Sequence, residues 1–231
     1  MKLKKKIKIV ISADGGAGSG KTTGSKLIAK KFNLKLLSSG LLYRYCAYKL
    51  LKNNKIKNKK TFLKKIVKKI TIKKLENKNL YSPEVTEYAS IIAKIKFVRD
   101  LLKYFQVNFA KSKKCIIEGR DIGTVILPGA KSDLKLFFKC SLNTKAKRRF
   151  LEYKKNNKKM TLSHVKSAIK TRDLEDTKRK ISPLRPTKGA VIVDTSKITK
   201  NQMRTKLFDI VYVALRKKYG KNLQKYKLPP N

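Results

Sequence analysis

Residues 7–32 read IKIVISADGGAGSGKTTGSKLIAKKF. Residues 7–13 are mostly apolar and rich in Ile and Val, as a buried strand requires, and a helical pattern spans residues 22–32. Between them, residues 15–22 fit the pattern G-x-x-x-x-G-K-[ST] in the strand–loop–helix setting that gives this pattern its meaning. The stretch predicts an α/β fold in which the first loop binds phosphate.

The chemistry of this loop follows from its residue types. Glycines allow successive backbone N–H groups to point into one concavity, and the helix that follows adds the positive end of its dipole. We expect Lys21 to reach the β- and γ-phosphates of a nucleoside triphosphate and Thr22 to place its hydroxyl on Mg²⁺. A Gly-rich turn that ends in Lys-Thr by chance is the alternative. The predicted ATP-binding residues are Gly15, Gly16, Ala17, Gly18, Ser19, Gly20, Lys21, Thr22 and Thr23.

The rest of the chain alternates short apolar runs with helical patterns, which predicts βαβ units and a five-stranded, parallel, doubly wound sheet. We expect one domain over residues 1–231, with charged insertions at 52–82 and 156–185, a small hairpin around 71–80 and a tail at 219–231. The further strands are predicted at 34–37, 115–118, 134–139 and 190–194, and the further helices at 41–51, 84–94, 96–110, 144–155, 162–178 and 200–217.

The composition is strongly basic. The 231 residues contain 61 Lys plus Arg against 14 Asp plus Glu, a formal charge of +47, and only ten of the 61 are Arg. Nucleic-acid binding is one interpretation; a lysine-rich composition that fills solvated positions is the other. The lysines are scattered, without interleaved aromatic residues, which favours the second interpretation and predicts no specific nucleic-acid partner.

The remaining composition narrows the chemistry. A single His, His164, excludes mechanisms that need two histidines, and three Cys without CxxC spacing argue against a disulfide framework or a cysteine zinc site. No segment approaches the roughly 18–20 apolar residues of a membrane helix. We therefore expect a cytoplasmic protein with reduced thiols and no membrane partner.

A second polar constellation follows later strands. Arg44 lies shortly after the second predicted strand and Arg120 after the third, and ligands of open α/β sheets bind beyond the carboxyl ends of the strands. Two arginines there would suit the phosphate of a monophosphate acceptor; surface arginines paired with carboxylates are the alternative. Arg172, Asp176 and Arg179 are spaced i, i+4 and i+7 on one predicted helix face. An ordinary surface helix with ion pairs would show the same spacing.

Taken together, these motifs resemble those of the bacterial cytidylate kinases. These enzymes are P-loop kinases of the nucleoside monophosphate kinase group with an adenylate-kinase-like fold. The run Gly-Arg-Asp-Ile-Gly-Thr-Val at residues 119–125, followed by Pro128 and Ala130, is its most specific part. The other matching residues are 14–23, Ser39-Gly40-x-x-Tyr43-Arg44, Val85-x-x-x-Ala89-Ser90, Val98-Arg99-x-x-Leu102, Arg148-Arg149, Arg172-Asp173-x-x-Asp176-x-x-Arg179-x-x-x-Pro183-Leu184 and Asp194-Thr195-Ser196.

The resemblance implies phosphoryl transfer from ATP to CMP or dCMP with Mg²⁺, usually by a monomer. It implies an acceptor-binding insertion at residues 39–110 and a lid at 149–180. The catalytic residues would be Lys21, Arg120, Arg172 and Arg179. The acceptor-binding residues would be Ser39, Arg44, Ser90, Arg99, Arg120, Asp121, Arg172, Asp176 and Arg179, with Ser90, Arg99 and Asp121 facing cytosine.

The chain departs from the family pattern at two positions, because Ser38 and Glu118 stand where the family usually has Asp. The segment formed by residues 75–82 is also shorter than the hairpin region that the family usually has. Two other functions stay open: a small P-loop kinase with UMP or a non-nucleotide acceptor, and a basic nucleic-acid-binding ATPase.

Overall fold

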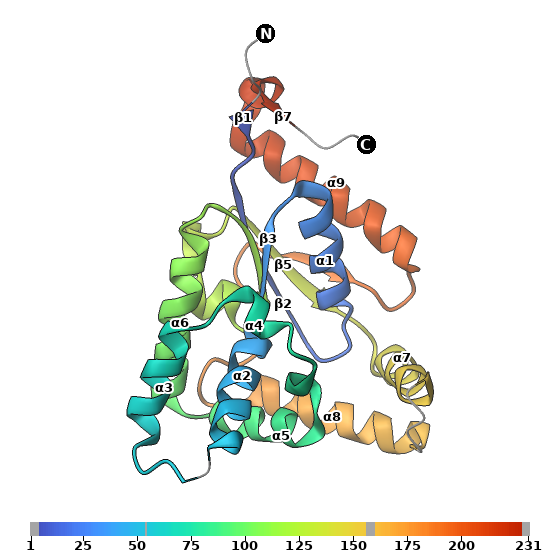
Figure 1. Cartoon of the computed structure of the whole chain (residues 1–231). Helices are drawn as coiled ribbons and strands as arrows, with labels where there is room; N and C mark the ends of the chain where they lie inside the picture. Colours follow the sequence, from blue (N-terminus) through green and yellow to red (C-terminus); the bar gives the residue numbers. More distant parts are fainter. Residues whose placement is uncertain (1–4, 54, 156–159, 228–231) are drawn as a thin grey trace. The chain divides into compact units, whose positions relative to one another are not determined.

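The computed structural model describes residues 5–53, 55–155 and 160–227 (Figure 1). It divides into two compact units. The first consists of Met1–Leu36 with Lys113–Asn231, and the second of Leu37–Ser112. The second unit contains the whole range, 39–110, that the sequence predicts as the acceptor-binding insertion.

The main sheet has five strands in the order β3-β4-β2-β5-β6. β2 lies in the middle and pairs in parallel with β4 and β5, and β5 pairs in parallel with β6. All seven residues of β2 are buried, including the polar Ser12 and Asp14. The predicted α/β class with a five-stranded parallel sheet is confirmed. The strands are β2 (Ile9–Gly15), β3 (Lys35–Ser38), β4 (Lys114–Gly119), β5 (Leu134–Lys139) and β6 (Val191–Asp194).

Helices α1 (Lys21–Phe32) and α9 (Lys200–Tyr219) pack side by side in the first unit (Figure 1). The ring of Phe32 meets Phe208 and Tyr212 edge-on, at centroid distances of 5.9 and 5.2 Å. At Gly24, a Cβ atom would come within 2.8 Å of the Phe138 ring. The glycine therefore allows α1 to approach the sheet closely and fixes the loop in front of it.

Two further helices of the first unit, α7 (Leu142–Lys155) and α8 (Leu162–Lys178), pack against each other. They enclose a small core of their own around Ala146, Val165 and Ile169. The link between them, residues 156–159, lies outside the described residues, as does part of the predicted lid, 149–180. Short turns η2 (Ile122–Ile126) and η3 (Gly129–Lys131) follow β4.

The two ends of the described chain meet. β1 (Lys5–Lys6) pairs in parallel with β7 (Tyr226–Lys227), which follows the turn η4 (Gly220–Lys225). The Tyr219 hydroxyl donates to the carbonyl of Lys8 at 2.7 Å and accepts from its N–H at 2.8 Å. Much of the range expected as a tail, 219–231, therefore has defined structure as far as residue 227.

The second unit is helical. A small hairpin around 71–80 is predicted, and this prediction is wrong, because the segment forms α4 and η1. Thr71 caps α4 by accepting from the N–H of Lys74 at 3.4 Å, and buried Leu75 and Leu80 anchor the two turns. The elements are α2 (Ser39–Lys52), α3 (Lys59–Lys68), α4 (Ile72–Leu75), η1 (Lys78–Tyr81), α5 (Pro83–Ile92) and α6 (Lys96–Ala110). Within the described residues, no helix of either unit has both the length and the apolar character to cross a membrane.

Candidate active site

The predicted phosphate loop lies between the carboxyl end of β2 and the first turn of α1. Gly18 and Gly20 have φ angles of 69° and 80°, a left-handed backbone that glycine adopts at little cost. The Ser19 hydroxyl donates to the carbonyl of Gly16 at 3.0 Å and closes the loop on itself. The loop thus curls back on itself in front of α1, and its binding of phosphate stays a prediction.

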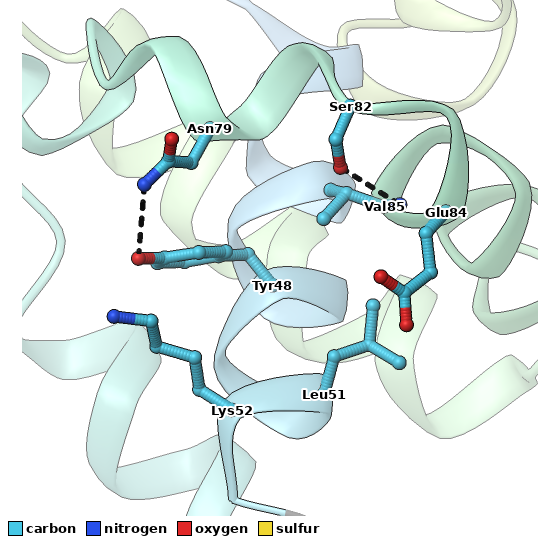
Figure 2. Close-up of a pocket in the computed structure, with 7 residues that line it drawn as sticks. All are labelled: Tyr48, Leu51, Lys52, Asn79, Ser82, Glu84 and Val85. Carbon is cyan, nitrogen blue, oxygen red and sulfur yellow. Dashed lines mark hydrogen bonds between the residues drawn. The ribbon is translucent and has the colours of Figure 1, made fainter.

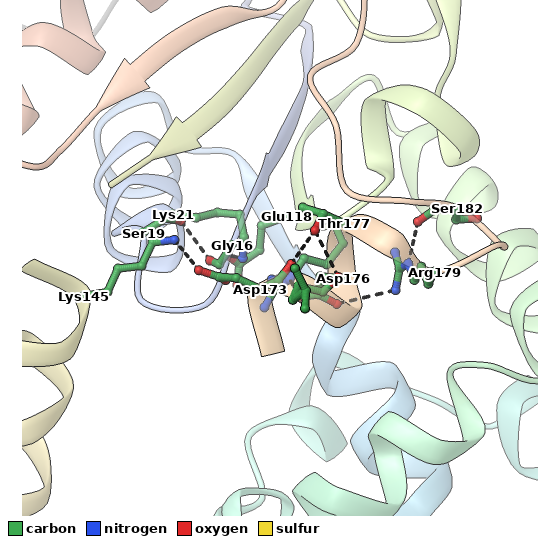
Figure 3. A network of polar contacts seen from close by, with 12 residues as sticks. Gly16, Ser19, Lys21, Glu118, Lys145, Asp173, Asp176, Thr177, Arg179 and Ser182 are labelled. Carbon is green, nitrogen blue, oxygen red and sulfur yellow. Dashed lines mark hydrogen bonds and ion pairs between the residues drawn. The ribbon is translucent and has the colours of Figure 1, made fainter. Parts of the chain in front are cut away.

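Lys21 and Thr22, the two side chains predicted to act on the donor, both contact the carboxylate of Glu118. Figure 3 shows Lys21 beside Glu118. Lys21 Nζ lies 3.1 Å from Glu118 Oε2, and the Thr22 hydroxyl donates to the same carboxylate at 2.9–3.0 Å. Lys21 is buried, and this burial lowers its pKa, while the charge of Glu118 acts in the opposite direction. Glu118 is therefore the negative partner of both donor-side groups. Its extra methylene relative to the usual Asp extends its reach toward them.

Asp14 is a buried carboxylate that the sequence does not single out as a site residue. Its two oxygens accept from the N–H groups of Ile122 at 2.8 Å and Gly123 at 2.7 Å. Burial raises its pKa to about 6, against the lowering effect of these two N–H groups. Asp14 thereby fixes the turn that follows Asp121 to the end of the central strand.

Arg120 and the carboxylate of Asp176 form an ion pair, with 2.6 Å between Nε and Oδ2. The other oxygen of Asp176, Oδ1, lies 3.7 Å from a terminal guanidinium nitrogen of Arg179 (Figure 3). The Nε of Arg179 donates to the carbonyl of Ser182 at 2.6 Å. The predicted placement on one helix is confirmed for Arg172 and Asp176, which both belong to α8. Arg179 lies just past the end of α8, in extended backbone, so its predicted place on the helix is wrong.

Arg172 lies among other cations. Burial lowers its pKa, and the charges of Arg120 and Arg149 lower it further, against the carboxylates of Asp176 and Asp173. Within the described residues, Arg172 forms no hydrogen bond or ion pair. A desolvated guanidinium in this position is suited to a polyanion.

Arg148, on α7, holds Thr195, the residue that connects the end of β6 to the phosphate loop, and is not among the predicted site residues. Its guanidinium donates to the hydroxyl of Thr195 at 3.1 Å and to the carbonyl of the same residue at 2.7 Å. The Thr195 hydroxyl in turn donates to the carbonyl of Ser19 at 3.0 Å. Two sequence signals could have pointed to it: the scarcity of Arg in this chain, and the match of Arg148-Arg149 to the family pattern.

Four predicted acceptor residues belong to the second unit. Ser39 is the buried first residue of α2, and the guanidinium of Arg44, one turn later, lies 5.2 Å from the ring centroid of Tyr81. Buried Arg99, on α6, donates to a backbone carbonyl at 3.0 Å, and Ser90, on α5, is exposed. Their approach to the residues of the first unit stays a prediction, including the convergence of Arg44 with Arg120.

A hollow of about 320 Å³ lies in the second unit (Figure 2). Asn79 donates from Nδ2 to the Tyr48 hydroxyl at 3.4 Å across it, and Lys52 lies over the Tyr48 ring at 5.2 Å. Hydrogen bonding with Lys52 and Asn79 lowers the pKa of Tyr48. None of the predicted site residues is among those that line this hollow: Tyr48, Leu51, Lys52, Asn79, Ser82, Glu84 and Val85.

Comparison with known proteins shows which family this chain resembles. A family model described as cytidylate kinase matches residues 11–212. The chain belongs to the cytidylate kinase family. The predicted family and the predicted enzyme class, a kinase, are both confirmed.

Individual cytidylate kinases match over nearly their full length. One from Caldicellulosiruptor saccharolyticus is 36% identical over 222 residues, covering 90% of this chain and 97% of the relative. One from Acidiphilium cryptum is 37% identical over 207 residues, covering 90% and 97%. The solved structure of an uncharacterized protein from Eubacterium ventriosum matches with a TM-score of 0.55 at 13% identity, covering 90% of this chain and 99% of that one, which bears on the fold alone.

Proposed function

We propose that this protein transfers the γ-phosphoryl group of ATP to CMP or dCMP, giving ADP and CDP or dCDP. The observation that carries the proposal is the arrangement at the carboxyl edge of the sheet. The phosphate loop with Lys21 provides a donor site, and the first unit also brings Arg120 and Arg179 together on Asp176. In phosphoryl transfer the protein mainly positions the groups and stabilises developing charge, and these residues suit both tasks.

On the donor side, backbone N–H groups of residues 15–20 and the amino terminus of α1 would hold the phosphates. Lys21 would exchange Glu118 for phosphate oxygens as its negative partner. Because Lys21 is buried, its attraction to an anion is screened less than that of a surface lysine.

The residues beside the loop fit a magnesium ion. Mg²⁺ takes oxygen ligands and usually binds through one or two protein oxygens together with water and substrate phosphate. The Thr22 hydroxyl and the Glu118 carboxylate, 2.9 Å apart, provide such oxygens next to the loop. Bound there, the ion would neutralise charge on the transferring phosphate.

On the acceptor side, Ser39, Arg44, Arg120 and Arg179 would hold the phosphate of CMP, with Arg172 and Asp176 near the sugar and the transferred group. Ser90, Arg99 and Asp121 would face the base. Cytosine presents an amino donor beside two acceptors, so a carboxylate and a guanidinium complement it. Asp121 is buried, as a residue that reads a base should be.

The two other functions have less support. A basic nucleic-acid-binding ATPase would need a continuous basic surface with aromatic residues, and a kinase for UMP would need the opposite donor and acceptor pattern at the base. We further propose that the enzyme works as a monomer in the cytoplasm, without a nucleic-acid or membrane partner.

Measurement of ADP release tests the proposal. The panel contains ATP and Mg²⁺ with CMP, dCMP, UMP, AMP, dTMP or single-stranded DNA, each added alone. We expect ADP formation that depends on CMP or dCMP and stops when Mg²⁺ is chelated. Turnover stimulated by DNA, or equal turnover with UMP, would contradict the proposal.

A further inference from the structure

One ion pair of the first unit lies against the phosphate loop and has no part in the function proposed above. Lys145, on α7, places Nζ 2.7 Å from Oδ2 of Asp173, on α8 (Figure 3). Both side chains are largely shielded from solvent, with 11% and 24% of their surfaces exposed. The pair is thus more than a surface contact.

The glycines of the loop show how closely the pair approaches. A Cβ atom on Gly16 would lie 2.8 Å from Asp173 Oδ1 and 3.2 Å from Lys145 Nζ. A Cβ atom on Gly18 would lie 3.4 Å from Lys145 Cβ. Both charges therefore lie directly beside the backbone that would hold the triphosphate.

The second oxygen of Asp173 is in an unfavourable position. Oδ1 is buried and, within the described part of the chain, accepts no hydrogen bond. A buried carboxylate oxygen without a donor is destabilising, and a triphosphate bound next to it would add repulsion between like charges. The cation of Lys145, at the same place, would attract the triphosphate. Donor binding therefore favours a rearrangement in which Lys145 exchanges its carboxylate for phosphate.

We propose that Lys145 is a further donor-binding residue, which contacts the phosphates of ATP, and that Asp173 is its counter-ion in the nucleotide-free enzyme. The inference rests on the proposed function, because it takes ATP to be the ligand of the loop. In this arrangement the carboxylate of Asp173 competes with the donor for the same ammonium group. Removal of the competitor and removal of the ammonium group should thus act on donor affinity in opposite directions.

Calorimetric titration with ATP tests this inference. We expect Lys145→Gln to weaken ATP binding about five- to tenfold, since a charge-assisted hydrogen bond is lost at a partly shielded site. Lys145→Arg, which keeps the charge, should restore most of the affinity. Asp173→Asn should tighten ATP binding about two- to fivefold, because a like charge beside the phosphates is removed. The matched control is Lys147→Gln, an exposed lysine on the same helix, which should bind ATP as the parent does.

The double variant Lys145→Gln/Asp173→Asn separates contact from neutralisation. If Lys145 contacts the phosphates, the double variant binds ATP more weakly than Asp173→Asn alone. If Lys145 serves only to neutralise Asp173, these two variants bind ATP equally, and the proposal is overturned. Unchanged affinity in Lys145→Gln would also overturn it. Thermal unfolding of each variant checks that α7 and α8 still pack.

Two further measurements distinguish this failure from failure of the proposed function. Binding of CMP should be the same in the Lys145 variants as in the parent, since the pair faces the donor loop. ADP release by the parent with CMP reports on the function itself. A parent without CMP kinase activity that still shows the expected ATP affinities would contradict the function and leave the Lys145 contact standing.

Discussion

Arg120 Nε lies 2.6 Å from Asp176 Oδ2, so the residue that follows the buried strand β4 is bound to the carboxylate on α8. Both groups are predicted to serve the acceptor, and here each satisfies the other. A bound phosphate would therefore compete with Asp176 for the guanidinium. This makes the geometry of the guanidinium, as well as its charge, important for the acceptor site.

The first prediction concerns that geometry. Arg120→Lys and, separately, Arg44→Lys should each weaken CMP binding about tenfold or more, because Lys cannot present two parallel N–H donors to a phosphate. Calorimetric titration with CMP measures the effect. Arg204→Lys, on α9, serves as the control and should bind CMP as the parent does. If both variants at the site keep the parent affinity, these arginines do not hold the acceptor phosphate.

The second prediction concerns Lys21. Lys21→Met should lower kcat/KM at least about a hundredfold, since a charge-assisted contact to the transferring phosphate is lost. The side chain of Lys21 is buried against Glu118. We therefore expect the variant to fold but to lose about 1–3 kcal/mol of stability, because a buried carboxylate loses one partner. Urea unfolding measures this loss. Turnover within a few-fold of the parent would exclude the assigned role.

The third prediction concerns the choice of base. Asp121→Asn should lower kcat/KM for CMP and bring the CMP-to-UMP ratio closer to one, while ATP affinity stays near that of the parent. Uracil would set its 4-oxo oxygen against the Asp121 carboxylate, at a cost of about 1–3 kcal/mol for the unsatisfied group. Steady-state kinetics with both acceptors measure the ratio. An equal loss with CMP and UMP would mean that Asp121 serves structure or catalysis instead.

The fourth prediction concerns pH. Burial raises the pKa of Asp14 to about 6 from an ordinary value of 3.8, so the folded protein binds more protons than the unfolded chain between these pH values. The contribution of Asp14 to stability is therefore most favourable below pH 3.8 and falls by up to about 3 kcal/mol as the pH rises to 6. The variant Asp14→Asn has no carboxyl group at this position and therefore lacks this pH-dependent contribution to stability.

Urea unfolding at pH 4, 5, 6 and 7 tests whether the contribution of Asp14 to stability falls as the pH rises. The free energy of unfolding of the parent minus that of Asp14→Asn should decrease across the interval and become constant above it. Subtraction removes the titration of the other groups. A difference that grows with pH would show that the N–H groups of Ile122 and Gly123 outweigh burial.

The fifth prediction concerns the surface charge. Lys57, Lys59 and Lys68 are exposed, and their combined replacement by Gln should leave CMP phosphorylation nearly unchanged. Any binding of single-stranded DNA by the parent should be weak and disappear at moderate salt, as expected for scattered charges. A tight complex that resists salt would favour the nucleic-acid-binding ATPase.

Elements with strong local signals were predictable from sequence. The helix predicted at 162–178 has the observed bounds of α8, because a capping Thr161 precedes it and Arg179 leaves the helical backbone. The helix α3 was not predicted, although Leu63 and Val67 are spaced for one buried face. The surrounding lysines gave that segment the composition of a loop.

The residues of the candidate site also differ in how far local sequence could predict them. The loop of residues 15–22 could be assigned because one local pattern carries its chemistry. The bond of Glu118 to Lys21 joins residues 97 positions apart, and no local pattern reports such a contact. Lys145 could not be predicted as a site residue from sequence, because it is one lysine among 51 and only the fold places it beside the loop.

The central position of β2 has a consequence for synthesis on the ribosome. This strand emerges early, yet its partner β4 begins at Lys114, about a hundred residues later, which takes roughly 5–20 s of translation at 5–20 residues per second. During that time an apolar segment built for burial has no neighbours and is prone to aggregate. Lys5, Lys6 and Lys8 immediately precede it, and such charges act as gatekeepers that oppose self-association. We therefore expect these three lysines to protect the nascent chain, a role for part of the basic composition that lies outside the folded enzyme.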